Sequence, residues 1–239
     1  MIDLSNIKIV LLETTHPGNI GSVARAMKTM NFSNLYLVNP LCQINEISFA
    51  MASNARDVLD NAKIYNNLEE VTDDCDFIIG TTARQRDIPI EIVNPRELSK
   101  NIKTSQYEKI AILLGNESRG LTNQQLSKCR IGCHIPANKS YTSLNIAASL
   151  QIILYEILME SRYNVSNINK IDKKNRAKND QFSSFLEHMD KVLKDINFVK
   201  DDRPTISRKI QHIFKKADLT EEEINILRGI LSAIENHSQ

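Results

Sequence analysis

The 239-residue chain lacks the long apolar run that a membrane-spanning segment requires. No hydrophobic stretch approaches the roughly 18 residues that cross a bilayer, and the N-terminus shows no signal-peptide pattern. Hydrophobic residues still make up 41% of the chain and charged residues 25%, values that are ordinary for a globular protein with a sizeable core. We therefore expect a cytoplasmic protein with no membrane partner, built from one large domain or a domain with a small appendage.

A strong charge of either sign is also missing, because the formal net charge is only +1. Composition alone therefore does not indicate a protein that binds nucleic acid. The basic residues gather instead in residues 166–180 and 203–217, and the second segment contains no acidic residue. Either segment could bind a polyanion, and an ordinary solvated surface explains the same pattern about as well.

The four cysteines contain no CxxC pair of the kind that holds zinc. Cys129 and Cys133 lie close in the sequence and His134 adjoins them. However, Cys133 and His134 fall on a predicted strand, where neighbouring side chains point to opposite faces. We therefore predict no metal site and expect small buried thiols in a reducing compartment.

Several common catalytic patterns are absent as well. The chain shows no HExxH sequence, no Ser/His/Asp order and no paired catalytic carboxylates. Its early glycines do not have the GxGxxG spacing of a dinucleotide site, and Leu121 stands where a phosphate-binding loop needs lysine. A site built from dispersed residues remains open.

Apolar runs and helical patterns alternate through residues 1–163. Strands are predicted at 7–12, 35–38, 63–65, 77–79 continuing into Gly80, 110–114 and 131–135. Helices are predicted at 19–30, 46–59, 68–73, 95–100 and 143–163, with a further helix capped by Thr122 and Gln125. Uniformly apolar strands separated by helices indicate an α/β domain with a mostly parallel sheet and helices on both faces.

The last predicted helix of this domain, residues 143–163, is apolar around most of its circumference. It could pack on the sheet with one side and on a second subunit with another, or be buried completely within one chain. Residues 164–180 are polar, basic and aperiodic, which predicts a linker. Residues 181–239 carry three short amphipathic patterns, which predict a small all-α bundle.

Three polar segments follow predicted strands in order. They are Asn19-x-Gly21-x-x-x-Arg25, Gly115-x-Glu117-x-x-Gly120-Leu121, and Ile135-Pro136 leading to Ser143-Leu144-Asn145. Glycines before a helix would let the backbone approach a ligand. Taken singly, each has an ordinary explanation: Arg25 as a surface arginine, Glu117 as a loop acid and Ser143 as a helix cap.

Together, these segments resemble the three motifs of the SpoU/TrmH branch of the SPOUT methyltransferases. The stretch 9–40 and the tail 224–231 are similar to the TrmJ-like tRNA methyltransferases of that branch, so the resemblance spans nearly the whole chain. It implies a trefoil knot at the C-terminal end of the α/β domain, and a homodimer in which one subunit completes the RNA site of the other. It also implies transfer of a methyl group from S-adenosyl-L-methionine to the ribose 2′-hydroxyl of cytidine or uridine 32 in the tRNA anticodon loop.

The resemblance further implies roles for individual residues. Arg25 would stabilise the developing alkoxide or hold the adjacent phosphate. Asn19 would order its loop, and the remaining catalytic candidates, Glu117, Ser143 and Asn145, would hold the hydroxyl, Arg25 or the loops in place. The cofactor-binding candidates are Thr81, Thr82, Ala83, Gly115, Ile135, Thr142, Ser143 and Leu144.

In the C-terminal bundle, Ile206, Ile210, Ile213 and Phe214 are predicted to share the apolar side of one helix. The RNA-binding candidates lie away from that side and are Arg208, Lys209, Lys215 and Lys216. A solvated charged surface would need no ligand. Two other functions remain open: the same chemistry on another tRNA or ribosomal RNA nucleotide, or an RNA-binding module without catalysis.

Overall fold

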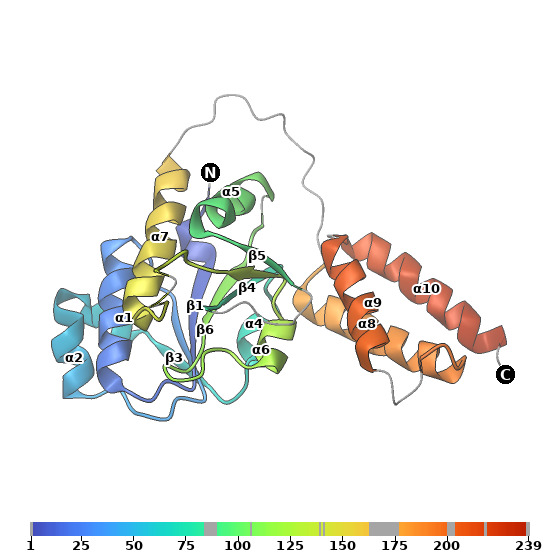
Figure 1. Cartoon of the computed structure of the whole chain (residues 1–239), viewed down its shortest axis with the longest axis horizontal. Helices are drawn as coiled ribbons and strands as arrows, with labels where there is room; N and C mark the ends of the chain where they lie inside the picture. The colour runs from blue at the N-terminus through green and yellow to red at the C-terminus, as the bar shows by residue number, and fades with distance from the viewer. Residues whose placement is uncertain are drawn as a thin grey trace. The chain divides into compact units, whose positions relative to one another are not determined.

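A computed structural model of the chain describes residues 2–83, 90–105, 107–138, 140, 142–162, 177–199, 204–217 and 219–237. The chain divides into two compact units, Met1–Ile168 and Asn169–Gln239 (Figure 1). Most of the predicted linker, residues 164–180, lies outside the described residues. No helix within the described ranges has the length and hydropathy needed to cross a membrane.

The first unit is built on a seven-stranded sheet with the order β3-β2-β1-β6-β4-β7-β5. Every pair of neighbouring strands is parallel. The strands are β1 (Ile7–Leu12), β2 (Leu35–Val38), β3 (Lys63–Tyr65), β4 (Phe77–Thr81), β5 (Glu91–Val93), β6 (Ile110–Leu114) and β7 (Ile131–Cys133). The predicted parallel sheet is therefore confirmed.

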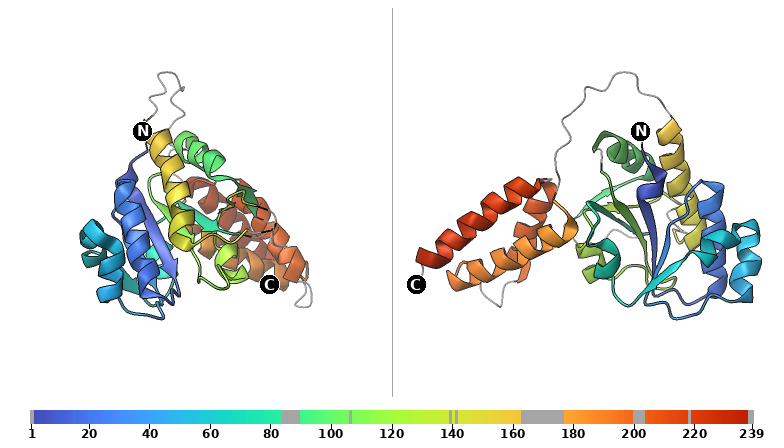
Figure 2. Two further views of the ribbon diagram at one scale, coloured as in Figure 1. Left: turned by 60° about the vertical axis from the view of Figure 1, so that its left-hand side comes forward. Right: turned by 180° about the vertical axis from the view of Figure 1, so that it is seen from behind.

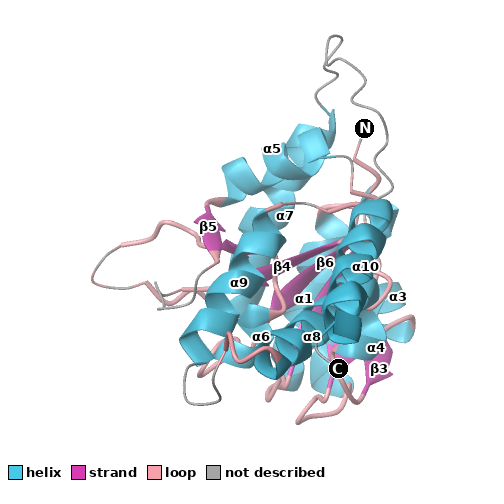
Figure 3. Ribbon diagram, turned by 90° about the vertical axis from the view of Figure 1, so that its right-hand side faces the viewer, coloured by secondary structure: helices cyan, strands magenta, loops and turns pink. Residues whose placement is uncertain are grey.

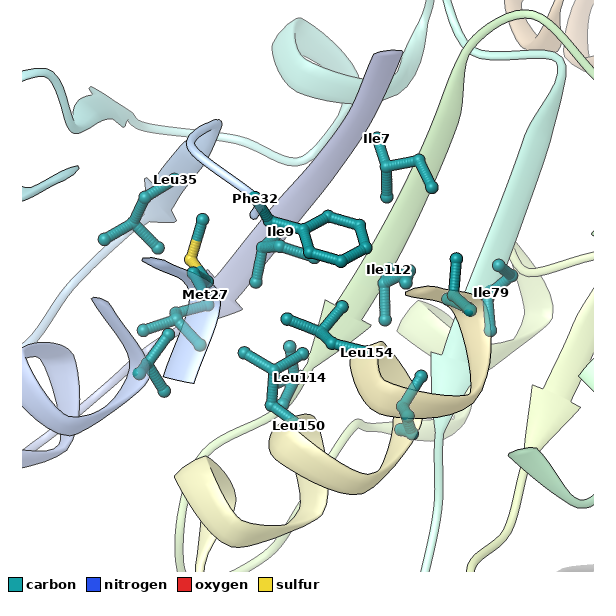
Figure 4. Close-up of a cluster of buried hydrophobic side chains, with 14 of the residues drawn as sticks. Ile7, Ile9, Met27, Phe32, Leu35, Ile79, Ile112, Leu114, Leu150 and Leu154 are labelled. Carbon is teal, nitrogen blue, oxygen red and sulfur yellow. The ribbon is translucent and has the colours of Figure 1, made fainter. Parts of the chain in front are cut away.

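Helices cover both faces of this sheet, as predicted. One face carries α1 (Pro17–Thr29), α2 (Glu46–Ala52), α5 (Pro95–Ser105) and α7 (Ile146–Arg162), and the other carries α4 (Glu69–Thr72) and α6 (Asn123–Ser127). Two views show α1 and α7 side by side against the sheet (Figures 1 and 2). Alternate strand residues enter the two cores, so that Ile9 and Ile112 meet Leu154 on one side (Figure 4). Val10 and Leu113 belong to the core on the other side.

Some predicted boundaries are wrong. The expected helix 46–59 is broken into α2, a 3-10 turn (Ser53–Ala55) and α3 (Arg56–Asp60), because Ser53 adopts a left-handed φ of 52°. The short strand β5 was not predicted, since two of its three residues are exposed and only its pairing with β7 makes it a strand. A short edge strand is defined by its neighbour more than by its own pattern.

The start of the long helix also differs from the prediction. Helix α7 begins at Ile146, and its N-cap is Asn145, whose Oδ1 accepts hydrogen bonds from the backbone N–H of Ala147 at 2.9 Å and of Ala148 at 3.3 Å. The interpretation of Ser143 as the cap is therefore wrong. Asparagine and serine cap helices about equally well, so composition could not decide between them.

Complete burial of α7 is excluded by its outer side. Ile152 is 40% exposed and Tyr155 is 48% exposed, although Leu150, Ile153 and Leu154 are fully buried. The helix thus has one apolar side on the sheet and a second apolar patch that the described residues of its own unit leave exposed.

The second unit consists, within the described residues, of helices alone (Figure 3). They are α8 (Asn179–Asp195), α9 (Pro204–Lys216) and α10 (Glu221–His237), and one hydrophobic cluster centred on Phe185 joins all three. The predicted three helices are confirmed. The apolar side of α9 is formed by Ile210 and Phe214, whereas Ile213 is 63% exposed, so its predicted place in the core is wrong. At about 100° per residue, Ile213 lies on the side of Ile210 that is away from Phe214, at the edge of the apolar side.

Candidate active site

A cavity of about 420 Å³ opens where the carboxyl ends of β4, β6 and β7 meet the start of α7. The carboxyl edge of a parallel sheet is where ligands bind in open α/β folds, and this volume suits a small organic molecule. Its lining includes Asn19, Thr81, Thr82, Ala83, Gly115, Glu117, Ile135, Thr142, Ser143, Leu144 and Asn145. All eight cofactor-binding candidates and four of the five catalytic candidates thus surround one cavity.

Arg25 is the exception. It is exposed on α1 and does not line the cavity. Arg25 follows Asn19 by six residues, which turns its side chain about 120° around the helix from Asn19. Within one subunit, the structure therefore separates Arg25 from the other candidates.

Glu117 is held by hydrogen bonds from a segment about one hundred residues earlier in the chain. Its Oε2 accepts from the backbone N–H of Thr15 at 3.0 Å and from the Thr15 hydroxyl at 2.8 Å. Its Oε1 accepts from Nδ2 of Asn19 at 3.0 Å. Both oxygens of the carboxylate are therefore occupied by donors.

These contacts favour the ionised carboxylate. Burial by itself raises the pKa of Glu117, but the hydrogen bonds from Asn19, from the backbone of Glu117 itself and from Thr15 together outweigh that effect, and the pKa is lowered overall. Glu117 is thus a negative charge at neutral pH, and it is the only Asp, Glu, Lys, Arg or His among the described residues that line the cavity.

The two asparagines of the site are linked to each other. Nδ2 of Asn145 donates to Oδ1 of Asn19 at 3.4 Å, while Oδ1 of Asn145 caps α7. The N-terminal ends of α1 and α7, 126 residues apart in sequence, are thereby joined at the edge of the cavity.

The glycines of the motifs serve packing between backbone segments. A Cβ on Gly21 would lie 2.0 Å from the carbonyl oxygen of Ser48, so Gly21 lets α1 approach α2. A Cβ on Gly115 would lie 2.2 Å from the backbone of Gly120 and Leu121, so Gly115 lets its own loop close. The interpretation of Gly21 as an opening for a ligand is therefore wrong.

The cysteines give no reason to expect metal at this site. Burial raises the pKa of the Cys133 thiol to about 12, so it stays protonated beside the cavity. Cys75, Cys129 and Cys133 are buried and Cys42 is half-buried, so the expectation of buried thiols is confirmed for three of the four. No group of three or more potential metal-ligating side chains occurs within the described part of the chain.

The chain is similar to known proteins along most of its length. The family model described as SpoU rRNA Methylase family matches residues 6–155, which is well over half of the chain. The chain belongs to the SpoU methylase family. A second family model, for the C-terminal domain of the tRNA methyltransferase TrmJ, matches residues 180–239.

Curated relatives in this family match almost end to end. A protein of Escherichia coli O6:K15:H31 named tRNA (cytidine/uridine-2′-O-)-methyltransferase TrmJ is 39% identical over 240 residues, covering 99% of this chain and 98% of the relative. The TrmJ of Photorhabdus laumondii is 40% identical over 236 residues, covering 97% and 98% of the two chains.

Solved structures in the family are similar over the same span. The crystal structure of TrmJ from Z. mobilis ZM4 has a TM-score of 0.82 at 27% identity, covering 95% of this chain and 98% of the other. A probable methylase family protein from Haemophilus influenzae Rd KW20 is 40% identical, with a TM-score of 0.64 and 98% coverage of both chains.

Several residues at this site were not predicted from the sequence. Ser149 and Ile153 also line the cavity, one and two turns after Asn145 on the same side of α7, and helical periodicity could have identified them. Thr15 and Asn116 had no such signal. Asn116 is buried and donates from Nδ2 to the carbonyl oxygen of Glu13 at 2.8 Å, a contact that depends entirely on the fold.

Proposed function

We propose that this protein transfers a methyl group from S-adenosyl-L-methionine to the ribose 2′-hydroxyl of cytidine or uridine in tRNA. The observation that carries the proposal is the convergence of three motif loops on one cavity whose lining holds a single ionised carboxylate. The near-complete match to relatives named as tRNA (cytidine/uridine-2′-O-)-methyltransferases supports the substrate. Nucleotide 32 of the anticodon loop is the expected position, and the cytoplasm is the expected compartment because the substrate is tRNA.

The cavity suits S-adenosyl-L-methionine in its charge and in the apolar surface of its lining. When bound, this cofactor supplies an activated methyl group on a positively charged sulfur. The lining of the cavity includes the negative Glu117. Among the described residues it contains no Lys or Arg of the kind that binds phosphate. Leu114, Ile135 and Ile153 provide apolar surface on which a flat base can pack. The residues that would hold the cofactor are Thr81, Thr82, Ala83, Gly115, Ile135, Thr142, Ser143 and Leu144.

The residues around the cavity can prepare a ribose hydroxyl for attack. Such a hydroxyl is a poor nucleophile at neutral pH and must lose its proton as the new O–C bond forms. Asn19, Ser143 and Asn145 present polar groups at the edge of the cavity and would orient the hydroxyl, while Glu117 holds Asn19. No metal ion is required for this transfer.

A homodimer would supply what one subunit lacks. Arg25 does not line the cavity of its own subunit, and Ile152 and Tyr155 leave an uncovered apolar patch on α7. We propose that two subunits associate through α7 and that Arg25 enters the partner's site, where a guanidinium can stabilise the developing alkoxide or hold a phosphate. The trefoil knot implied by the motifs would be formed by the loops that line the cavity.

The second unit would bind the tRNA. Arg208, Lys209 and Lys216 are exposed on α9, and Lys215 beside them is half-buried. We propose a methyltransferase domain at residues 1–163, a linker at 164–180 and a tRNA-binding extension at 181–239. Catalysis and RNA binding would then be divided between the two units. Phosphate contacts from lysine and arginine give affinity that does not depend on base sequence.

The proposal is tested by supplying the purified protein with labelled S-adenosyl-L-methionine and tRNA, and then mapping the modified nucleotide. Label on the 2′-oxygen of cytidine or uridine 32 is the expected result. Ribosomal RNA serves as the competing substrate, and tRNA from a deletion strain serves as the unmodified acceptor. A protein that binds the cofactor but labels no tRNA would overturn the proposed function.

A further inference from the structure

Thr15 lies outside the three motifs and contacts the side chain of Glu117 directly. It lies in the loop between β1 and α1, and both its backbone N–H and its hydroxyl donate to Oε2 of Glu117. The two residues are 102 positions apart in the sequence. The neighbouring Asn116 fastens the same two loops by donating to the carbonyl oxygen of Glu13. The loop after β6 is thus tied to the loop after β1 at two successive residues.

The direction of each hydrogen bond in this group is fixed. An ionised carboxylate can only accept, so Asn19 must turn its Nδ2 toward Glu117. Asn145 has already committed its Oδ1 to the first turn of α7 and can only donate from Nδ2. Asn19 therefore presents Oδ1, an acceptor with a second lone pair, toward Asn145, and both asparagines line the cavity.

We propose that Thr15 is a positioning residue for methyl transfer, which acts by holding Glu117 so that Asn19 offers its Oδ1 to the ribose hydroxyl. The inference rests on the proposed function. A carboxylate held at both oxygens cannot swing away or rotate, and the amide that it orients is fixed as an acceptor. The hydroxyl that donates to Oδ1 of Asn19 is thereby aimed before the proton leaves.

Other ionisable side chains lie around Glu117. Glu13, on the loop after β1, is paired with Arg119 on the loop of Glu117. Cys42 lies near enough that the charge of Glu117 adds to the effect of burial in raising the pKa of the Cys42 thiol. The ring of His16 accepts through Nδ1 from the backbone N–H of Gly18 at 3.1 Å. Glu13 is therefore the other carboxyl whose protonation has to be separated from that of Glu117.

The sign of the pH response follows from the lowered pKa of Glu117. Ionised Glu117 keeps the hydrogen-bonded group intact above that pKa, and the order is lost as the pH falls through it. Thr15→Val removes the hydroxyl donor and leaves the backbone N–H, so the pKa of Glu117 rises. The hydrogen-bonded group then begins to lose its order at a higher pH. Thr15→Ser keeps the hydroxyl and the low pKa.

The first measurement is kcat for tRNA methylation against pH. We expect Thr15→Val to lower kcat about fivefold at neutral pH, the effect of one lost hydrogen bond, with KM for both substrates unchanged. The fall of kcat at low pH, the acid limb of the profile, should move to higher pH in this variant. Thr15→Ser should restore both the kcat at neutral pH and the position of the acid limb. Glu13→Gln should leave the acid limb in place, and Thr104→Val, which removes an exposed hydroxyl on α5, is the matched control.

A second measurement does not depend on activity. Carbon-13 NMR of the glutamate carboxyls, with Glu117 assigned by Glu117→Gln, gives its pKa directly in the full-length protein. A higher pKa in Thr15→Val than in the wild type supports the inference even if the substrate proves not to be tRNA. An unchanged pKa together with an unchanged acid limb would overturn it, whatever the assay says of the proposed function.

Discussion

The two units of the chain create their polar surfaces in opposite ways. In the first unit, the side chains around the cavity come from segments about one hundred residues apart and are held by hydrogen bonds such as that from Asn19 to Glu117. In the second unit, the basic residues of α9 follow one another on a single helix and are placed by its period alone. Packing between distant segments can fix the position of one side-chain atom relative to another. Charged side chains on the surface of a single helix are held in position much less strictly.

The largest effect is expected from Arg25→Ala, which removes the one catalytic candidate outside the cavity of its own subunit. Loss of a group that stabilises developing charge costs about a hundred- to a thousandfold in kcat. Binding of S-adenosyl-L-methionine should be nearly unchanged, because Arg25 does not line the cavity. Radiolabel transfer and calorimetry measure the two quantities. A folded variant with near-normal turnover would contradict the role of Arg25.

Mixed dimers sharpen this prediction. A dimer that combines one Arg25→Ala subunit with one Asn19→Ala subunit retains one complete site if Arg25 serves the partner, and none if it serves its own cavity. We expect the mixed dimer to recover activity that neither parent dimer has. Failure to recover activity in a dimer confirmed by light scattering would place Arg25 with its own subunit.

A smaller effect is expected from replacing Arg208, Lys209, Lys215 and Lys216 together by alanine. If all four contact phosphates, the slope of log affinity against log salt should fall by about three units, since each contact contributes roughly 0.7 to 0.9. Affinity for the cofactor should not change. Filter binding of tRNA across a salt series provides the measurement.

Lys191→Ala is the matched control for this experiment. Lys191 is exposed on α8 but already paired with Glu235 at 2.9 Å, so its loss should leave the slope nearly unaltered. An unaltered slope in the quadruple variant as well would assign the α9 cluster to solubility.

The smallest effects are expected at two helical glycines, one in each unit. Gly21→Ala forces a Cβ against the Ser48 carbonyl and should lower the free energy of unfolding by about 1–3 kcal/mol. Gly229→Ala on α10 meets nothing within 4 Å and should raise it by about 0.5–1 kcal/mol. Thermal unfolding followed by circular dichroism compares the two. Equal destabilisation by both substitutions would contradict the conclusion that Gly21 is tightly packed and Gly229 is not.

Much of the fold was predictable because its signals are local. Runs of apolar or strand-forming residues identified six of the seven strands. Strand β5 was missed because only its pairing with β7 makes its three residues a strand. The capping box at Thr122 was confirmed, since a cap depends on residues three positions apart. The cap of α7 was misassigned because two suitable residues, Ser143 and Asn145, lie next to its start.

The sequence by itself determined the parallel α/β unit, the three-helix unit and the set of motifs, because hydrophobic period and motif order are properties of neighbouring residues. Only the tertiary structure decided that Thr15 and Asn19 hold Glu117, that Gly21 serves packing against α2, and that Arg25 lies away from the cavity. Those facts depend on contacts between segments far apart in the chain. Such contacts arise when the strands line up in the order β1-β6-β4-β7 and bring their carboxyl ends to one edge.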